Sequence, residues 1–254
     1  MLLLTIIFVF ADTTISYSYK MAFLLTIDTA MERGSVGFFR SGEQLHILQN
    51  ASPKDHAAFV QAAIADLAKA TGTSLEGLDA IAVVAGPGSY TGVRVGLATA
   101  KGICYALDKK LILVNTLDVM ARASILASGG KDYLYSPMID ARRDDVFTGV
   151  YDNRGAPVEQ KKALTVTPDT FRSFLREKRL VLSGSGAAKA ARIIDSDNVV
   201  VSDTIYEVGD INTIAQEKYG RKAFADVAYS EPDYLKAFYS TAKPATPNTK
   251  IHTP

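Results

Sequence analysis

The sequence predicts an α/β protein built from two similar lobes, and two observations support this fold class. Apolar strands and helical segments follow the order βββαβαβα over residues 21–128, and nearly the same order recurs over residues 129–240. An Ile-Asp pair also ends a strand in both halves, in "TIDTAMERGSVGFF" at 26–39 and "MIDARRDDVFTGVY" at 138–151. The sequence therefore predicts a duplication, with the lobe boundary at Gly129-Gly130.

In the first lobe, short apolar runs bounded by glycine or polar turns predict strands, and apolar residues at helical spacing predict helices. Gly72 is expected just beyond the end of the first helix. The run "AIAVVA" is continuously apolar, as in a strand covered on both faces. The expected strands cover residues 23–27, 35–39, 44–48, 80–85 and 111–114, and the helices cover 55–71, a segment ending near 107, and 117–127.

The second lobe repeats the pattern. Strands are expected over 134–139, 145–151, 158–166, 180–182 and 199–201, and helices over 168–178, 187–194 and 211–222. A duplicated fold of this kind is the ribonuclease-H-like pair of lobes of actin, Hsp70 and sugar kinases. No other arrangement accounts for this order of elements as economically.

The two ends of the chain differ from the rest. Residues 1–20 contain an apolar run too short to span a bilayer, with no Lys or Arg before it. We expect an extension before a natural start at Met21, with a cleaved export signal as the alternative. Residues 241–254 are rich in Pro and Thr, which predicts a disordered tail.

Composition excludes several classes of function. The net charge of +1 provides no field that would attract nucleic acid unaided. Cys104 is the single cysteine, so the chain has neither a disulfide framework nor a cysteine-based zinc site. The three histidines lack the His-x-x-x-His spacing of a metal site, since Val60 follows His56 at that interval. We expect a cytoplasmic protein with no metal and no membrane contact.

The segment "AGPGSYTGVRVGL" at 85–97 follows a buried strand and opens a helix, where free backbone N–H groups can hold an anion. It lacks the Gly-Lys-Ser/Thr of a P-loop and the spacing of a dinucleotide fingerprint. A tight turn capped by Ser89 or Thr91 is the alternative. Anion or nucleotide binding, in vestigial form, would use Asp28, Thr29, Gly86, Gly88, Ser89, Gly184 and Gly186.

The helix after this turn carries Gly92, Gly96, Ala100 and Cys104 at intervals of four, a small-residue stripe. Such a stripe permits very close packing, either within the lobe or across a subunit interface. Two glycines inside a helix cost about 1 kcal/mol each relative to alanine, which indicates a packing requirement. The candidate interface comprises Phe59, Ala63, Gly92, Val93, Gly96, Leu97, Ala100 and Cys104.

These motifs resemble those of the bacterial TsaB (YeaZ-type) family, whose signature is G-P-G-S-[FY]-T-G-[LV]-R-[IV]-G. "LLTIDTA" at 24–30, "IDARRDDVFTGVY" at 139–151 and "PDYLKAF" at 232–238 resemble other segments of that family. The resemblance covers roughly residues 21–240. One departure is His56-Ala57-Ala58, where the family often has His-Ser-Glu.

The resemblance implies a subunit without catalytic residues that activates TsaD, which builds threonylcarbamoyladenosine at adenosine 37 of ANN-reading transfer RNAs. It further implies a heterodimer with TsaD through the helices near 55–70 and 91–107, recruitment of the TsaE ATPase, and contact with transfer RNA only within the complex. A homodimer of the isolated chain is compatible with the same helix face. No cofactor is expected beyond weak nucleotide binding. The alternatives are an ATP-dependent small-molecule kinase using Asp28 and the glycine loop, and an M22-type metallopeptidase.

Overall fold

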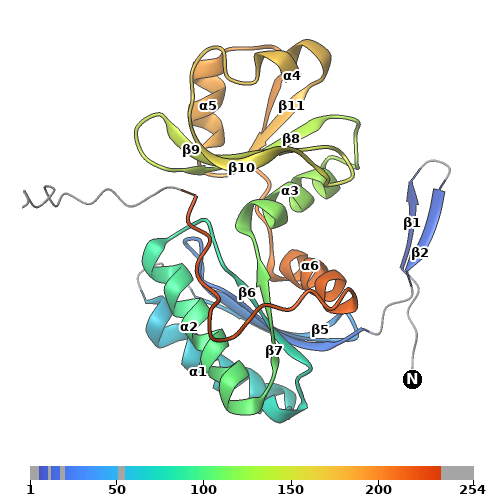
Figure 1. The fold of residues 1–254 in the computed structure, drawn as a ribbon, viewed down its shortest axis with the longest axis vertical. Helices are drawn as coiled ribbons and strands as arrows, with labels where there is room; N and C mark the ends of the chain where they lie inside the picture. Colours follow the sequence, from blue (N-terminus) through green and yellow to red (C-terminus); the bar gives the residue numbers. More distant parts are fainter. Residues whose placement is uncertain (1–5, 11–12, 18–20, 51–54, 236–254) are drawn as a thin grey trace, which may run out of the picture.

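The computed structural model describes residues 6–10, 13–17, 21–50 and 55–235 of the chain. Its body consists of two lobes, each built on one five-stranded sheet (Figure 1). The strand orders are β5-β4-β3-β6-β7 and β10-β9-β8-β11-β12, which are the same order shifted by one repeat. The duplicated ribonuclease-H-like fold expected from the sequence is confirmed.

The first sheet consists of a three-stranded antiparallel meander and two further strands that run parallel to the central strand, β3. The meander comprises β3 (Phe23–Asp28), β4 (Ser35–Arg40) and β5 (Glu43–Gln49), and the parallel strands are β6 (Ala80–Val84) and β7 (Lys110–Val114). The helices are α1 (His56–Thr71), α2 (Tyr90–Leu107) and α3 (Thr116–Ala127), with a short 3₁₀ turn, η1 (Leu75–Gly77), that the sequence did not predict.

The second lobe repeats this plan with β8 (Leu134–Asp140), β9 (Asp145–Tyr151), β10 (Pro157–Thr165), α4 (Arg172–Glu177), β11 (Leu180–Ser183), α5 (Ala187–Ile194), β12 (Val199–Ser202) and α6 (Val208–Gly220). The helix expected from Pro168 begins only at Arg172. Phe171 has a left-handed φ of 62°, and Thr170 Oγ1 accepts a hydrogen bond from Thr167 N. The hydrogen bond closes a separate turn, and the left-handed residue ends that turn before the helix starts.

The last helix of each repeat packs on the sheet of the other repeat, so the two lobes do not divide simply at residue 129. Helix α3 covers one face of the second sheet, against β8, β11 and β9. Helix α6 returns to the first sheet and lies against β7, β3 and β6. The two helices also contact each other, so they form the junction between the lobes (Figure 1). Residues 129–240 therefore do not form a lobe that is closed on itself.

The alternating side chains of β6 explain why its sequence is apolar throughout. Ile81 and Val83 join the core under α1 and α2, whereas Ala82 and Val84 join the core under α6. Both faces are covered because the two repeats contribute helices to opposite sides of the first sheet. The second sheet is covered in the same way, by α3 on one face and by α4 and α5 on the other.

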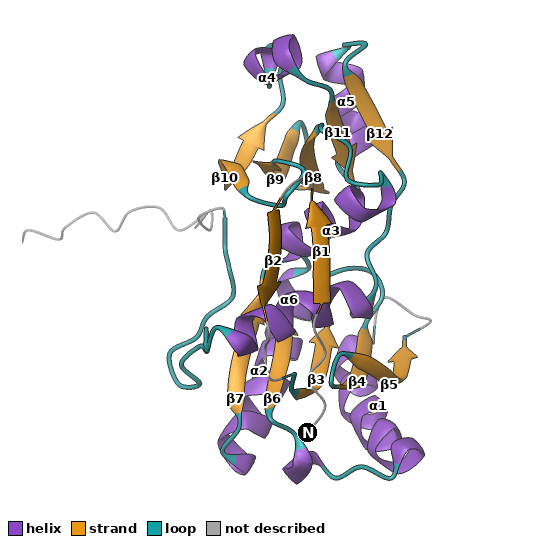
Figure 2. Ribbon diagram, turned by 90° about the vertical axis from the view of Figure 1, so that its right-hand side faces the viewer, coloured by secondary structure: helices purple, strands orange, loops and turns teal. Residues whose placement is uncertain are grey.

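One pair of strands is separate from the two five-stranded sheets. Strands β1 (Ile6–Phe10) and β2 (Thr13–Tyr17) pair antiparallel as a separate two-stranded sheet (Figure 2). The expected tail at 241–254 lies outside the described residues. Among the helices that the structure describes, none is long and apolar enough to cross a membrane.

Candidate functional site

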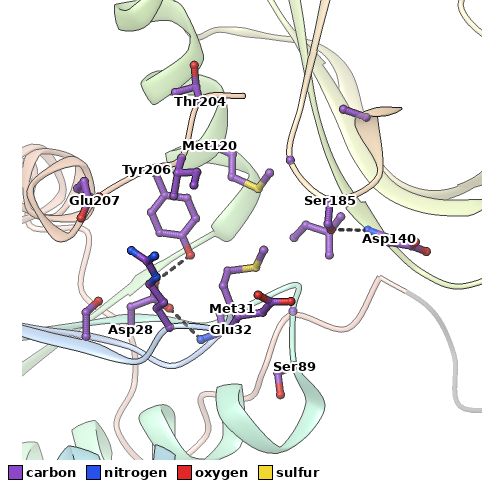
Figure 3. Close-up of a pocket in the computed structure, with 18 of the residues that line it drawn as sticks. Asp28, Met31, Glu32, Ser89, Met120, Asp140, Ser185, Thr204, Tyr206 and Glu207 are labelled. Carbon is purple, nitrogen blue, oxygen red and sulfur yellow. Dashed lines mark hydrogen bonds between the residues drawn. The ribbon is translucent and has the colours of Figure 1, made fainter. Parts of the chain in front are cut away.

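The candidate site is a cavity of about 850 Å³ between the two lobes. It lies where β3, β6, β8 and β11 end, so that the turns after these four strands meet across it. The segment from β12 to α6 closes one side. Figure 3 shows Met31, Met120 and Tyr206 reaching the cavity from different elements, together with the carboxylate of Glu32.

The cavity brings together four of the seven residues that the sequence assigned to an anion or nucleotide loop. Asp28, Gly88, Ser89 and Gly184 line it. The other three, Thr29, Gly86 and Gly186, are not among the lining residues. The Thr29 hydroxyl instead donates a 2.6 Å hydrogen bond to the Gly92 carbonyl oxygen and is fully buried. Gly186 packs closely against Val146 and Met138.

Asp28 is the central buried acid of the site, with 3% of its surface exposed. One of its carboxylate oxygens accepts a 2.8 Å hydrogen bond from Ala30 N, and the other accepts a 2.8 Å hydrogen bond from the Tyr206 hydroxyl (Figure 3). Burial raises the pKa of Asp28 to about 6, against the opposing effect of these hydrogen bonds. Burial beside Asp28 also raises the pKa of the Tyr206 phenol. Asp28 thus joins the segment after β12 to the first sheet.

Asp140 is the counterpart of Asp28 at the end of β8, but its surroundings differ. Its carboxylate is half exposed and accepts a 2.8 Å hydrogen bond from Lys189 Nζ, which lowers its pKa. Lys189 also donates to the carbonyl oxygens of Arg143 and Asp145. Arg142 and Arg143 both adopt positive φ in this turn, where a phosphate loop would have glycines. The carboxylate of Asp140 therefore binds Lys189, which also binds the turn, and this ion pair competes with any ligand for the carboxylate.

The charges around the cavity are predominantly negative. Five carboxylates line it, against Arg33 and His56 as the basic side chains; the five are Asp28, Glu32, Asp140, Asp203 and Glu207. Two like charges about 6 Å apart repel by roughly 3 kcal/mol at an effective dielectric constant near 20. A nucleoside triphosphate would face several such repulsions. The arrangement disfavours polyphosphate binding in the absence of added cations.

The glycines of the signature are explained by close packing of α2 on the turn after β3. A Cβ atom at Gly88 would lie 2.3 Å from the Ala30 carbonyl oxygen, and one at Gly92 would lie 2.0 Å from that of Thr29. At Gly96 it would lie 2.4 Å from Thr29 Oγ1. Ser89 caps the helix by accepting a 3.2 Å hydrogen bond from Gly92 N. The segment therefore forms the tight turn capped by Ser89, which was one of the two structures that the sequence allowed.

This packing corrects the predicted interface. The small-residue stripe faces the lobe's own sheet: Ala100 and Cys104 are buried in the core under α1 and α2, and Gly92 and Gly96 pack against Thr29 in the turn after β3. A partner cannot reach these side chains; the buried set is Ala63, Gly92, Val93, Gly96, Leu97, Ala100 and Cys104. Phe59 is half-buried and packs against the same core. The alternative of packing within the lobe is therefore correct for the stripe.

The opposite sides of α1 and α2 are exposed. Both helices lie on one face of the first sheet and contact each other, with Gln61 Nε2 donating to Thr99 Oγ1 at 3.3 Å. We define the docking face as the small, exposed positions that recur on the outer side of both helices: Ala58, Ala62, Ala65, Ala98, Gly102 and Ala106. No atom lies within 4 Å of the position that a Cβ of Gly102 would occupy. All six positions carry an uncharged side chain no larger than a methyl group.

Several residues of the cavity were not predicted from the sequence. Tyr206 is 178 positions from Asp28, and no motif links the two. Met31, Met120 and Phe147 form part of an apolar cluster near the cavity, yet they come from three different elements. Within the described ranges, no group of three or more His, Cys, Asp or Glu side chains is placed to hold a metal ion.

The fold and the cavity define a class: two-lobed proteins whose duplicated ribonuclease-H-like sheets enclose a cleft. The family model described as "TsaD: tRNA N6-adenosine threonylcarbamoyltransferase" matches residues 48–243. The "tRNA threonylcarbamoyladenosine biosynthesis protein TsaB" of Haemophilus influenzae is 34% identical over 84% of this chain and 93% of that protein. The Bacillus subtilis protein of the same name is 29% identical, over 87% and 96%.

A solved structure titled "YeaZ from Pseudomonas aeruginosa" has a TM-score of 0.72 and 25% identity, covering 85% of this chain and 100% of that one. The chain belongs to the TsaB family, within the wider group that the TsaD family model matches.

Proposed function

We propose that this chain is a non-catalytic subunit of the machinery that attaches a threonylcarbamoyl group to adenosine 37 of transfer RNAs reading ANN codons. It would dock on the TsaD-type transferase and hold it in an active state, and TsaE would join the larger complex. Transfer RNA would be met only within that complex. The observation that carries the proposal is the match to TsaB proteins along more than nine-tenths of their length.

The outer sides of α1 and α2 supply a physical basis for docking. Small side chains let helices approach closely, so a second pair of helices can pack on the docking face as in a four-helix bundle. The TsaD family model spans residues 48–243, a range that contains both helices. A TsaD-type partner would therefore present a related helix pair. The position of the surface differs from the one that the sequence suggested, since the buried stripe lies on the other side of α2.

The charge of the cavity supports a non-catalytic role. Five carboxylates against Arg33 and His56 give poor complementarity to a triphosphate. A kinase of this fold would need the opposite balance, or cations to compensate it. Calorimetric titration of the isolated chain with ATP and magnesium distinguishes a non-catalytic subunit from a kinase. Tight, magnesium-dependent binding would favour the kinase alternative.

Ala98→Arg tests the docking face. The residue is exposed near the middle of α2, so arginine is compatible with the fold but places a long charged side chain where a partner helix must approach. We expect loss of co-purification with the TsaD-type subunit of the same genome. Ala156→Arg, at an exposed alanine in the β9–β10 turn, is the matched control. Unchanged association of Ala98→Arg would exclude this surface.

A further inference from the structure

The segment 225–235 runs alongside α2 after α6, and we call it the strap (Figure 1). Its first residue is held at the edge of the first sheet, where Ala225 N donates a 2.8 Å hydrogen bond to the Leu111 carbonyl oxygen. Its middle is held by α2 itself. Lys101 Nζ donates to the carbonyl oxygens of Ala228 at 3.0 Å and of Ser230 at 2.9 Å.

The far end of the strap is held by a second residue of α2. Arg94 Nε donates a 2.7 Å hydrogen bond to the Tyr234 hydroxyl, and the Arg94 guanidinium stacks 3.8 Å from the centre of the Tyr90 ring. Asp233 N donates to the Ala85 carbonyl oxygen at 2.8 Å, and Asn115 Nδ2 donates to the Asp233 carboxylate at 2.5 Å. The strap is thus fixed along its length, and a partner that contacts it need not order it first.

Two tyrosines stand out from the surface that α2 and the strap form. Tyr105 is 87% exposed and Tyr229 is 85% exposed, the highest values among the large apolar and aromatic side chains of the described residues. Both lie beside Lys101: Tyr105 one helical turn further along α2, and Tyr229 between the two residues whose carbonyl groups bind the lysine. Exposed tyrosines of this kind commonly anchor protein interfaces.

We propose that the strap is part of the surface that binds the TsaD-type subunit, with Tyr105 and Tyr229 as its aromatic anchors. This inference rests on the proposed function. The docking face provides close approach but no large side chain, whereas interfaces draw most of their affinity from a few large residues. The strap supplies such residues, and its surface is continuous with α2.

Tyr229→Ala and Tyr105→Ala test the inference in the full-length chain, with the dissociation constant for the purified TsaD-type subunit as the measurement. We expect each change to weaken binding roughly tenfold. Tyr229→Phe should retain most of the affinity because the ring remains. Leu126→Ala removes a similarly large exposed side chain from α3 and should leave affinity unchanged. Both tyrosines are solvent-exposed, so thermal unfolding of the variants should match that of the native protein.

The outcomes separate this inference from the proposed function. If Ala98→Arg abolishes binding but neither tyrosine variant weakens it, the strap inference is wrong and the proposed function stands. If binding persists in Ala98→Arg as well, the docking face itself is wrong. If the tyrosine variants disrupt only self-association of this chain, the surface serves a second copy and the inference is overturned.

Discussion

Gly92→Ala tests whether the glycines of the signature serve packing within the lobe. The new Cβ atom would lie 2.0 Å from the Thr29 carbonyl oxygen and 3.1 Å from the Thr29 carbonyl carbon. Both are backbone atoms at the end of a buried strand, so they cannot rotate away as a side chain could. Either α2 or the turn after β3 must shift. That shift would also strain the 2.6 Å hydrogen bond from Thr29 Oγ1 to the Gly92 carbonyl oxygen.

The expected size of the effect follows from three contributions. Overpacking a close contact costs about 1–3 kcal/mol. Weakening the hydrogen bond adds about 1 kcal/mol, and the greater helix propensity of alanine returns about 1 kcal/mol. The net expectation is a loss of about 1–3 kcal/mol in the free energy of unfolding. Gly102→Ala is the matched control on the same helix: nothing lies within 4 Å of its Cβ position, so only the propensity gain applies.

Urea unfolding followed by circular dichroism provides the measurement. We expect the two substitutions to shift the midpoint in opposite directions, downward for Gly92→Ala and upward for Gly102→Ala. A stabilised Gly92→Ala protein would refute the packing explanation, since it would mean that α2 does not approach Thr29 as closely as the structure shows.

Two further expectations concern the cavity and the strap. The pKa of Asp28 is raised from 3.8 to about 6, so the folded protein holds this proton more tightly than the unfolded chain does. Stability should therefore fall by up to about 3 kcal/mol as pH rises from about 4 to 6. Asp28→Asn should flatten that part of the pH profile of urea midpoints; an identical slope in both proteins would contradict the assignment. Arg94→Ala removes the contacts to Tyr234 and Tyr90, and limited proteolysis should then cut the strap faster than in the native protein. Arg172→Ala, which breaks an exposed ion pair in the second lobe, should not change the rate of cleavage there.

The sequence by itself determined the fold class and most of the elements. Strands and helices differ in the period of their apolar residues, and that local signal survives without tertiary information. The repeated Ile-Asp strand ends also placed Asp28 and Asp140 at corresponding positions of the two repeats, on turns that meet at the cavity. The spacing of Gly92, Gly96, Ala100 and Cys104 correctly indicated a close packing contact.

Only the tertiary structure decided which surface that contact faces. A stripe of small residues permits close approach but does not specify the neighbour, and here the neighbour is Thr29, 63 positions earlier in the chain. The return of α6 to the first sheet and the Asp28–Tyr206 hydrogen bond likewise join distant segments. Such contacts depend on how the two sheets and their shared helices pack. The local period of apolar residues does not specify which distant residue will be the neighbour.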